Sequence, residues 1–481
     1  MAKQGSFATD AVRLTASKII GNVLTLVSAM LLARIRTLEE NGIYSELMLV
    51  ISLAAAIFML GLPNAINFFL AKAETREEKN RFLSFYYTLS TLLSAALGVT
   101  LCALTPVWVR YFNDPKLTQF LFFLLLFPWE RMIISSVENV LVVLGRTRML
   151  LYYRISNSVF LLLIIFYVWI THSSFMTYMI LLVIVDGVYA VSVYVLASRY
   201  TGRLRFSLDR EMIRRVLAFS LPLGLAAIVG TLNIEIDKLM LGHLLTTDQL
   251  AIYANASKEL PLTIVASSLT AVLMPKMVRL FRAQENEAAV AIWRDVTTIS
   301  YAIMAFFAFG MAAFATDAMI VLYSEKYASG GAVFAVYSLG LLLKCTYFGM
   351  VLNTTGNTRL VLWSAIGALV VNGILNWVLY LLLGVIGPAV ATLAAAVLMN
   401  LFQLVFSCRI TGVPFSRILP WRDLLGLTAL NAAFAAAFIA LHRFVLPGVW
   451  QAVVLAAVWG ALYGALLFRP AVRRWKQLKS I

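Results

Sequence analysis

The chain has 481 residues, of which 62% are hydrophobic and only 13% are charged, and its mean hydropathy is +0.88. Because a soluble domain carries about 25% charged residues, this composition excludes a soluble enzyme, a secreted disulfide-rich protein and a disordered protein. Lys and Arg outnumber Asp and Glu by 39 to 23. In a membrane protein such an excess lies in the cytoplasmic loops, so it does not indicate nucleic-acid binding.

Fourteen apolar stretches are long enough to cross a bilayer, which requires about 20 residues in a helix. In chain order they are 14–33, 43–70, 83–105, 118–143, 149–170, 175–198, 216–241, 249–274, 296–315, 331–352, 360–380, 385–408, 424–441 and 449–468. The connections between them are short, which leaves no extramembrane domain for a soluble active site. The sequence therefore predicts an all-α polytopic membrane protein with about fourteen transmembrane helices, and not an enzyme.

The basic residues are unevenly divided between the two sides of these spans. Of the 39 Lys and Arg residues, 27 lie in one set of connections and the termini, 6 lie in the other set, and 6 lie within spans. Because loops rich in Lys and Arg stay in the cytoplasm, we expect both termini to be cytoplasmic. An even number of spans follows, in agreement with fourteen.

Two pairs of short segments recur at nearly the same spacing. Thr37–Tyr44 is similar to Thr246–Tyr253 at an offset of 209 residues, and Gly145–Arg148 is similar to Gly356–Arg359 at an offset of 211. Because six spans is an even number, the two copies are expected to enter the membrane in the same sense, with a cavity between them. The predicted domains are two pseudo-symmetric six-helix lobes (1–205 and 206–412) and a C-terminal helix pair with a basic tail (413–481). This is the architecture of a transporter.

Three segments carry a family resemblance: Ser220-Leu-Pro-Leu-Gly-Leu, Ile236-Asp-Lys-Leu-Met-Leu-Gly and Ile252-Tyr-Ala-Asn. They are similar to the seventh and eighth spans of bacterial polysaccharide flippases of the Wzx type, which export O-antigen and exopolysaccharide units. These flippases belong to the multidrug/oligosaccharidyl-lipid/polysaccharide exporter superfamily. The turn at Gly356–Arg359 also resembles a recurring element of the family.

The resemblance implies a transporter that flips an undecaprenyl-pyrophosphate-linked oligosaccharide or polysaccharide repeat unit from the cytoplasmic to the periplasmic leaflet. It also implies that the last two helices flank a groove for the lipid tail. The expected location is the bacterial cytoplasmic (inner) membrane. The expected partners are the lipid-linked glycan, the lipid bilayer and the polysaccharide polymerase or chain-length machinery, and not a nucleic acid.

Ionisable residues within the spans are candidates for function, because each costs roughly 2.5–3.5 kcal/mol at a helix centre. The cations predicted to line a substrate cavity are Lys18, Arg131, Lys258, Lys344 and Arg154. Ammonium and guanidinium groups can replace part of the hydration of a pyrophosphate, and Arg can do so bidentately. For Arg154, which lies near a span end, a side chain reaching out to the interface is an equal alternative.

Carboxylates within the spans are candidates for ion coupling. They are Asp186, Glu138, Glu259 and Asp237. The alternative for Asp186, Glu138 and Glu259 is a buried polar group satisfied by a neighbouring helix. For Asp237, near the outer boundary of its span, the alternative is snorkelling or a boundary ion pair. Because the chain lacks a Gly-x-x-x-x-Gly-Lys-Ser/Thr loop, we expect the membrane potential, or proton or sodium antiport, to supply the energy.

No cofactor or metal is expected. The three cysteines are isolated in apolar surroundings and the three histidines are far apart in sequence, at Cys102, Cys345 and Cys408 and at His172, His243 and His442. Two other functions remain open. A multidrug cation antiporter of the same superfamily would line its cavity with carboxylates, and a flippase for a peptidoglycan lipid precursor would also carry a pyrophosphate lipid.

Overall fold

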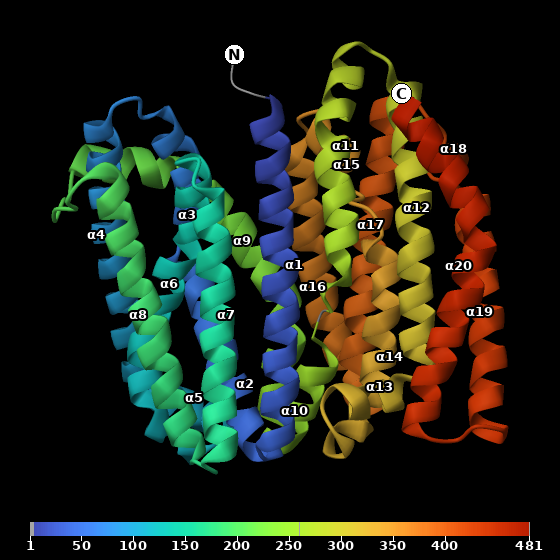
Figure 1. Ribbon diagram of the computed structural model, residues 1–481, viewed down its shortest axis with the longest axis horizontal. Coiled ribbons are helices and arrows are strands. Elements are labelled where there is room, and N and C mark those ends of the chain that lie inside the picture. Colours follow the sequence, from blue (N-terminus) through green and yellow to red (C-terminus); the bar gives the residue numbers. More distant parts are fainter. Residues whose placement is uncertain (1–3, 259, 481) are drawn as a thin grey trace. The chain divides into compact units, whose positions relative to one another are not determined.

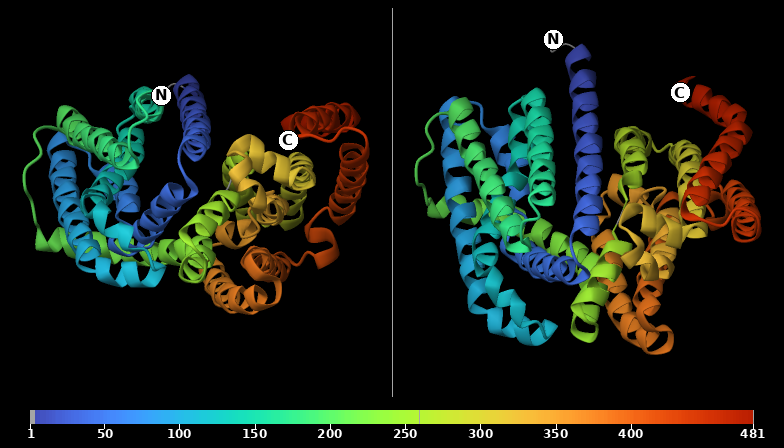
Figure 2. Two further views of the ribbon diagram at one scale, coloured as in Figure 1. Left: turned by 90° about the horizontal axis from the view of Figure 1, so that it is seen from below. Right: turned by 60° about the horizontal axis from the view of Figure 1, so that its bottom comes forward.

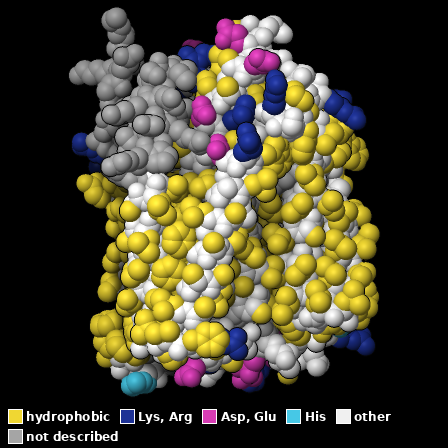
Figure 3. All heavy atoms as spheres, turned by 90° about the vertical axis from the view of Figure 1, so that its right-hand side faces the viewer, with side chains coloured by type: hydrophobic (Ala, Val, Ile, Leu, Met, Phe, Trp, Pro, Cys, Tyr) yellow, Lys and Arg dark blue, Asp and Glu magenta, His cyan; other side chains and the backbone are white. Residues whose placement is uncertain are grey.

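The computed structural model describes residues 4–258 and 260–480, and the regular structure of these residues is helical, without strands (Figure 1). Thirteen stretches of the described residues are long and apolar enough to cross a membrane. The longest, Thr358–Thr411, contains two helices, α16 (Thr358–Leu383) and α17 (Gly387–Thr411), so the predicted polytopic all-α fold with about fourteen spanning helices is confirmed. On the face shown in Figure 3, hydrophobic side chains form a broad middle band and charged side chains gather above and below it.

Contacts between residues divide the chain into two compact units, Met1–Ala251 and Ile252–Ile481, each described here by itself. The helical segments that lie in unit 1 are α1 (Gln4–Ile35), α2 (Leu38–Phe58), α3 (Leu62–Ala65), the π-helical η1 (Ile66–Leu70), α4 (Arg76–Ala103), α5 (Thr105–Phe112), η2 (Pro115–Phe120), α6 (Leu121–Val143), α7 (Thr147–Ile170), α8 (Phe175–Thr201), α9 (Arg210–Leu244) and the start of α10 (Thr247–Ala256). Helix α6 packs against α4, α7 and α8, and α1 packs against α7. Helix α6, which carries Glu130, Arg131 and Glu138, therefore contacts three other helices of this unit.

Helix α9 packs within unit 1, where it contacts α2 and α3. The close approach depends on glycine at the break between α2 and α3, because a Cβ on Gly61 would lie 2.4 Å from the carbonyl oxygen of Ser220. Gly61 also has a φ of 70°, a conformation that glycine adopts without strain. The contact units thus divide the chain after α9, while the three domains expected from the sequence repeat stay a prediction.

Unit 2 contains the remaining helices. They are the end of α10, η3 (Pro261–Thr263), α11 (Ile264–Arg282), α12 (Asn286–Ala313), α13 (Ala315–Leu322), η4 (Glu325–Gly330), α14 (Gly331–Leu339), η5 (Gly340–Lys344), α15 (Met350–Thr354), α16, η6 (Gly384–Ile386), α17, α18 (Phe415–Ile418), α19 (Trp421–Phe444) and α20 (Val449–Ser480). Helix α12 packs against α11, α14, α19 and α20, and α16 packs along α17. Helices α19 and α20, coloured red, lie side by side in both views of Figure 2.

The internal repeat is visible in the lengths of the helices. Helices α4, α5 and η2 have 28, 8 and 6 residues, and α12, α13 and η4 have the same three lengths. Each of the second set begins 210 residues after its counterpart, for example at Asn286 and Arg76. The order of elements in the chain therefore supports the duplication inferred from the sequence.

Helix caps explain why those particular sequence segments recur. At the start of α2, Thr37 and Glu40 form a capping box, in which each side chain accepts the other residue's backbone N–H (3.1 and 3.0 Å). Thr246 and Gln249 make the same reciprocal bonds (3.4 and 3.2 Å) before α10. These bonds satisfy N–H groups that the first turn of a helix leaves without partners.

The second recurring segment is a helix end followed by a helix start. Gly145 and Gly356 have φ angles of 68° and 82°. In both copies the next backbone N–H donates to the carbonyl five residues earlier, from Arg146 to Leu141 and from Asn357 to Leu352, each at 2.7 Å. This is the bond by which a left-handed glycine terminates a helix, so both sequence matches mark helix boundaries.

Candidate functional site

Glu138 holds two of the predicted cations together. Its Oε1 lies 2.9 Å from Lys18 Nζ of α1, and its Oε2 is paired with the guanidinium of Arg154 on α7. The three groups come from three helices, α1, α6 and α7. These helices are neighbours, since α7 packs against both α1 and α6. These two cations and one carboxylate, counted among the described residues alone, carry a net charge of +1, and we call the three residues the cationic cluster.

The cationic cluster remains accessible. The Lys18 side chain is 48% exposed, while those of Glu138 and Arg154 are 28% and 24% exposed. A shared carboxylate lowers the cost of two cations within a membrane span, but it cannot neutralise both of them. The cluster can therefore attract an anion, with an ammonium group as a point charge and a guanidinium group for bidentate hydrogen bonds.

Arg131 does not join this cluster. It is exposed on α6, and its guanidinium carbon lies 5.2 Å from the centre of the Phe127 ring one turn earlier. Its neighbour Glu130 is 1% exposed and therefore faces the interior of the unit. Adjacent residues of a helix point about 100° apart, which explains the contrast.

Glu130 and Asp186 form a buried acidic pair. Asp186 on α8 is 3% exposed and accepts a hydrogen bond from Asn157 Nδ2 of α7 at 3.1 Å. Glu130 Oε1 lies 3.4 Å from the position of a Cβ on Gly187, the residue next to Asp186, so Glu130 reaches the part of α8 that carries Asp186. Glu130 Oε2 has no hydrogen-bond partner among the described residues. Such a pair can hold a proton or a small cation, because two adjacent carboxylates do not both ionise readily in a buried site.

The other predicted residues lie elsewhere. Lys258 is exposed and donates to Asn255 Oδ1 at 2.7 Å, and Lys344 is exposed at the end of η5. Both belong to unit 2, whereas the cationic cluster belongs to unit 1, so a common cavity for all five cations stays a prediction. Glu259 lies outside the described residues.

Asp237 is buried in α9, with 1% exposure, and its Oδ1 accepts the backbone N–H of Lys238 at 2.7 Å. The Lys238 ammonium group pairs with Glu235 at 2.6 Å. The ion pair of Lys238 is thus made with the carboxylate one turn earlier in the helix, because residues three apart face each other and adjacent ones do not.

The sequence model of the family described as "Polysaccharide biosynthesis protein" matches residues 7–281, which is more than half of the chain. The chain belongs to this family. The succinoglycan biosynthesis transport protein ExoT of Rhizobium meliloti (strain 1021) is 27% identical over 190 residues. The match covers 38% of this chain and 36% of that relative, so it spans about a third of the relative's length.

Solved structures agree on the fold of this polysaccharide biosynthesis protein. The lipid II flippase MurJ in an inward closed conformation matches with a TM-score of 0.76 at 16% identity, over 96% of this chain and 100% of that one. Inward-facing and outward-facing MATE family multidrug transporters of the MOP superfamily match with TM-scores of 0.63 and 0.57 at 15% and 17% identity. They cover 84% of this chain in each case, and 99% and 95% of the transporters. The family match confirms the resemblance to polysaccharide biosynthesis proteins, and these structures show that the chain shares the fold of such flippases and multidrug transporters.

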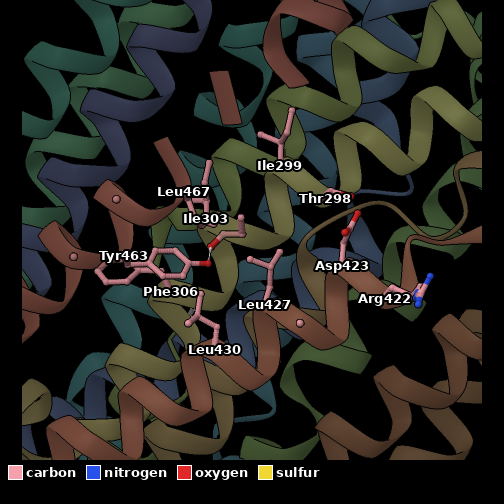
Figure 4. A pocket seen from close by; sticks show the side chains of 14 residues that line it. Thr298, Ile299, Ile303, Phe306, Arg422, Asp423, Leu427, Leu430, Tyr463 and Leu467 are labelled. Carbon is pink, nitrogen blue, oxygen red and sulfur yellow. Dashed lines mark hydrogen bonds between the residues drawn. The ribbon is translucent and has the colours of Figure 1, made fainter. Parts of the chain in front are cut away.

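A largely apolar groove lies in unit 2 of this family member (Figure 4). It has a volume of about 640 Å³ and is lined by α12, α19 and α20. Ile303, Phe306 and Leu430 are among its apolar residues, and Arg422 and Asp423 add charge. Helices α19 and α20 are the last two spans. The family resemblance implies that these two helices flank a groove for a lipid tail.

Two buried carboxyl residues were missed as site candidates. Glu130 lies within the predicted span 118–143 beside Arg131, and the sequence does not reveal which of these two residues faces the interior of the helix bundle. Glu46 of α2 is 1% exposed, and its Oε2 has no hydrogen-bond partner within the described part of the chain. Glu46 lies within the predicted span 43–70, and an acidic residue inside a span is the only feature of the sequence that indicates a functional role for it.

Proposed function

We propose that this protein flips a lipid-linked oligosaccharide or polysaccharide repeat unit from the cytoplasmic to the periplasmic leaflet by alternating access. The carrier would be undecaprenyl pyrophosphate. Membership of the polysaccharide biosynthesis family supports a glycan substrate. The name of the relative that transports succinoglycan and the fold shared with a lipid II flippase point in the same direction.

The observation that carries the proposal is the cationic cluster. A diphosphate brought into a membrane span without partners would lose hydration worth tens of kcal/mol by Born solvation. Lys18 and Arg154 share the carboxylate of Glu138, so these three described groups carry a net charge of +1, and Lys18 is accessible. The pyrophosphate would bind here by competing with Glu138 for the two cations.

The apolar groove of α12, α19 and α20 supports the lipid part of this substrate. A polyprenyl chain has no hydrogen-bonding groups, and the groove offers it mainly aliphatic and aromatic surface. The glycan itself is polar and would remain in water. This separation of tail and headgroup is what a flippase for a lipid-linked sugar requires.

The energy would come from the membrane potential, from ion antiport, or from both. Movement of two negative charges outward gains roughly 4–5 kcal/mol at 100 mV, at about 2.3 kcal/mol per charge. Asp186 is the strongest coupling candidate, because Glu130 lies beside it and neither forms an ion pair with a cation among the described residues. Glu138, Glu259 and Asp237 remain the other coupling candidates.

The test is transport of a labelled undecaprenyl-pyrophosphate oligosaccharide in vesicles that contain the purified protein. Lys18→Gln and Arg154→Gln should each lower the flux at least 10-fold, because a lost charge-assisted contact costs about 1.5–3 kcal/mol. The matched control is Lys116→Gln, which removes the exposed ion pair with Glu39 and should leave the flux unchanged. Full flux in both cluster variants would refute the proposal.

The same vesicles separate the alternatives. Uptake of cationic drugs without glycan transport would identify a multidrug antiporter. Transport of the peptidoglycan precursor in preference to polysaccharide units would identify the second alternative, which shares the pyrophosphate lipid and therefore the same cluster.

A further inference from the structure

The connection between α8 and α9, residues 202–209, lies along the outer side of α4, as the views of Figures 1 and 2 agree. We call this segment the strap. Asn80 Nδ2 donates to the carbonyl oxygens of Gly202 and Arg203, at 2.6 and 3.3 Å. Further along, the backbone N–H of Arg205 donates to Ser84 Oγ at 3.1 Å, and that of Ser207 donates to Thr88 Oγ1 at 3.2 Å.

The repeat distances of the two elements match. Asn80, Ser84 and Thr88 follow one another at intervals of four residues and so share one face of α4. Four helical residues advance about 6 Å and two extended residues about 6.7 Å. A chain in extended conformation can therefore meet each successive turn of α4, which fixes the strap along the helix.

The strap is anchored on its inner side as well. Leu204 packs against the hydrophobic core of unit 1. At the far end, Asp209 caps α9 by accepting the N–H groups of Glu211 and Met212, and it forms a 2.7 Å ion pair with Arg81. The strap is thus part of the folded unit and not a loose linker.

The strap lies where α4 changes from polar to apolar. The first residues of α4, Arg76–Asn80, are polar, and the apolar part begins at Phe82. Backbone groups that approach a hydrocarbon layer need partners within the protein, because lipid tails offer none. Ser84 and Thr88 supply such partners to the strap, as expected for a segment at the boundary between headgroups and acyl chains.

The outer side of the strap is apolar and basic. Phe206 is 75% exposed and Leu208 is 46% exposed. Six exposed arginines lie in and around it, at positions 199, 203, 205, 210, 214 and 215, against the two acidic residues Asp209 and Glu211. Apolar side chains beside several arginines are the combination that binds an anionic lipid surface.

We propose that the strap docks on anionic phospholipid, with Phe206 and Leu208 inserted at the acyl boundary and the arginines bound to headgroup phosphates. This interaction is independent of the transported substrate and adds a lipid-binding surface to unit 1. Lipid is favoured over a protein partner because the strap lies at the polar-to-apolar boundary of a spanning helix.

The first experiment measures the depth of residue 206 in the full chain. Phe206→Cys is introduced after Cys102, Cys345 and Cys408 are replaced by Ala, labelled with a small fluorophore and reconstituted in vesicles with phosphatidylglycerol. Nitroxide on the lipid chain near the headgroup should quench this label at least twofold more than a label at Glu77→Cys, in the polar first turn of α4. A label at Val188→Cys, on an exposed position of the α8 span, is the lipid-facing reference.

The outcome that overturns the proposal is quenching of residue 206 by aqueous iodide to the same extent as residue 77, with no effect of lipid nitroxide. Protection from iodide that requires an added soluble protein would also overturn it, in favour of a protein partner.

The second experiment tests the arginines. Phosphatidylglycerol should increase nitroxide quenching at residue 206 at least twofold over vesicles of phosphatidylethanolamine alone. The double variant Arg203→Gln/Arg205→Gln should lose this increase. The variant Arg110→Gln/Arg443→Gln, which removes two exposed arginines outside the strap, should keep it. An equal response of both double variants would refute a role for the strap arginines.

Discussion

Glu138 and Glu130 lie on the same helix, eight residues and about 12 Å apart, and their surroundings are opposite. Glu138 is partly exposed and pairs with two cations, whereas Glu130 is buried, and one of its oxygens has no hydrogen-bond partner among residues 4–258 and 260–480. One site therefore has a net positive charge and can bind an anion, and the other can bind a proton or a small cation. The comparison teaches that the role of an acidic residue in a membrane span does not follow from its residue type. It depends on the helices that pack around the carboxyl group.

The largest effect is expected from a reversal of charge at the cationic cluster. Lys18→Glu changes its net charge from +1 to −1, so the flux of the pyrophosphate-linked glycan should fall more than about 100-fold, because like charges in an interface cost several kcal/mol. The double variant Lys18→Glu/Glu138→Lys restores the net charge and should recover part of the flux. Vesicle transport measures both. Unchanged flux in the single variant would remove the cluster from the mechanism.

The next effect concerns the position of α6, which carries both carboxylates. A Cβ on Gly98 of α4 would lie 2.3 Å from the carbonyl oxygen of Leu125 on α6. Gly98→Ala should therefore push the helices apart, lower the free energy of unfolding by about 1–3 kcal/mol and impair both sites together.

Gly230→Ala is the matched control, because no atom of the described residues lies within 4 Å of its new Cβ. It should be neutral or stabilise the protein by up to about 1 kcal/mol through helix propensity. Thermal unfolding of the purified protein checks both changes. Equal stability of the two variants would show that α4 and α6 can separate without cost.

A smaller effect is expected at the acidic pair. Glu130→Gln keeps the shape of the side chain but removes the titrating group. The variant should lose the increase in glycan flux that a pH gradient produces, a loss of about 10-fold at most. Transport driven by the membrane potential should remain. Flux measured with each gradient alone gives the answer. A Glu130→Gln variant that still responds fully to the pH gradient would assign coupling to another carboxylate.

The smallest effect lies outside both sites, at Asp209. Its pKa is held below the ordinary value, first by the hydrogen bond from Arg81 and then by the backbone N–H of Met212. The charged carboxylate therefore stabilises the fold above its ordinary pKa of about 3.9, and this contribution is lost as the pH falls through the lowered pKa. Asp209→Asn should show a slightly weaker loss of thermal stability between about pH 6 and about pH 3. The same dependence of thermal stability on pH in Asp209→Asn and in the unmodified protein would contradict the prediction.

The sequence predicts the spans well because each one is a long apolar run, and it predicts the repeat because capping residues such as Thr37 and Thr246 recur. It does not predict the pairing of Lys18 with Glu138, 120 residues away, because that contact depends on how α1, α6 and α7 pack. Lys18 has no acid one turn away in its own helix, and its partner comes from another helix. The side of α6 that faces the core decides between Glu130 and Arg131, and two adjacent polar residues carry no such information.

The carboxylate between Lys18 and Arg154 also has a consequence for turnover. An empty carrier with two bare cations would retain any phosphate that it met and release it slowly. If the cluster binds the pyrophosphate as proposed, Glu138 would pair with both cations in the empty protein and would assist release of the cargo by pairing with them again. In the proposed mechanism these three residues would therefore combine a modest affinity for the pyrophosphate with its rapid release.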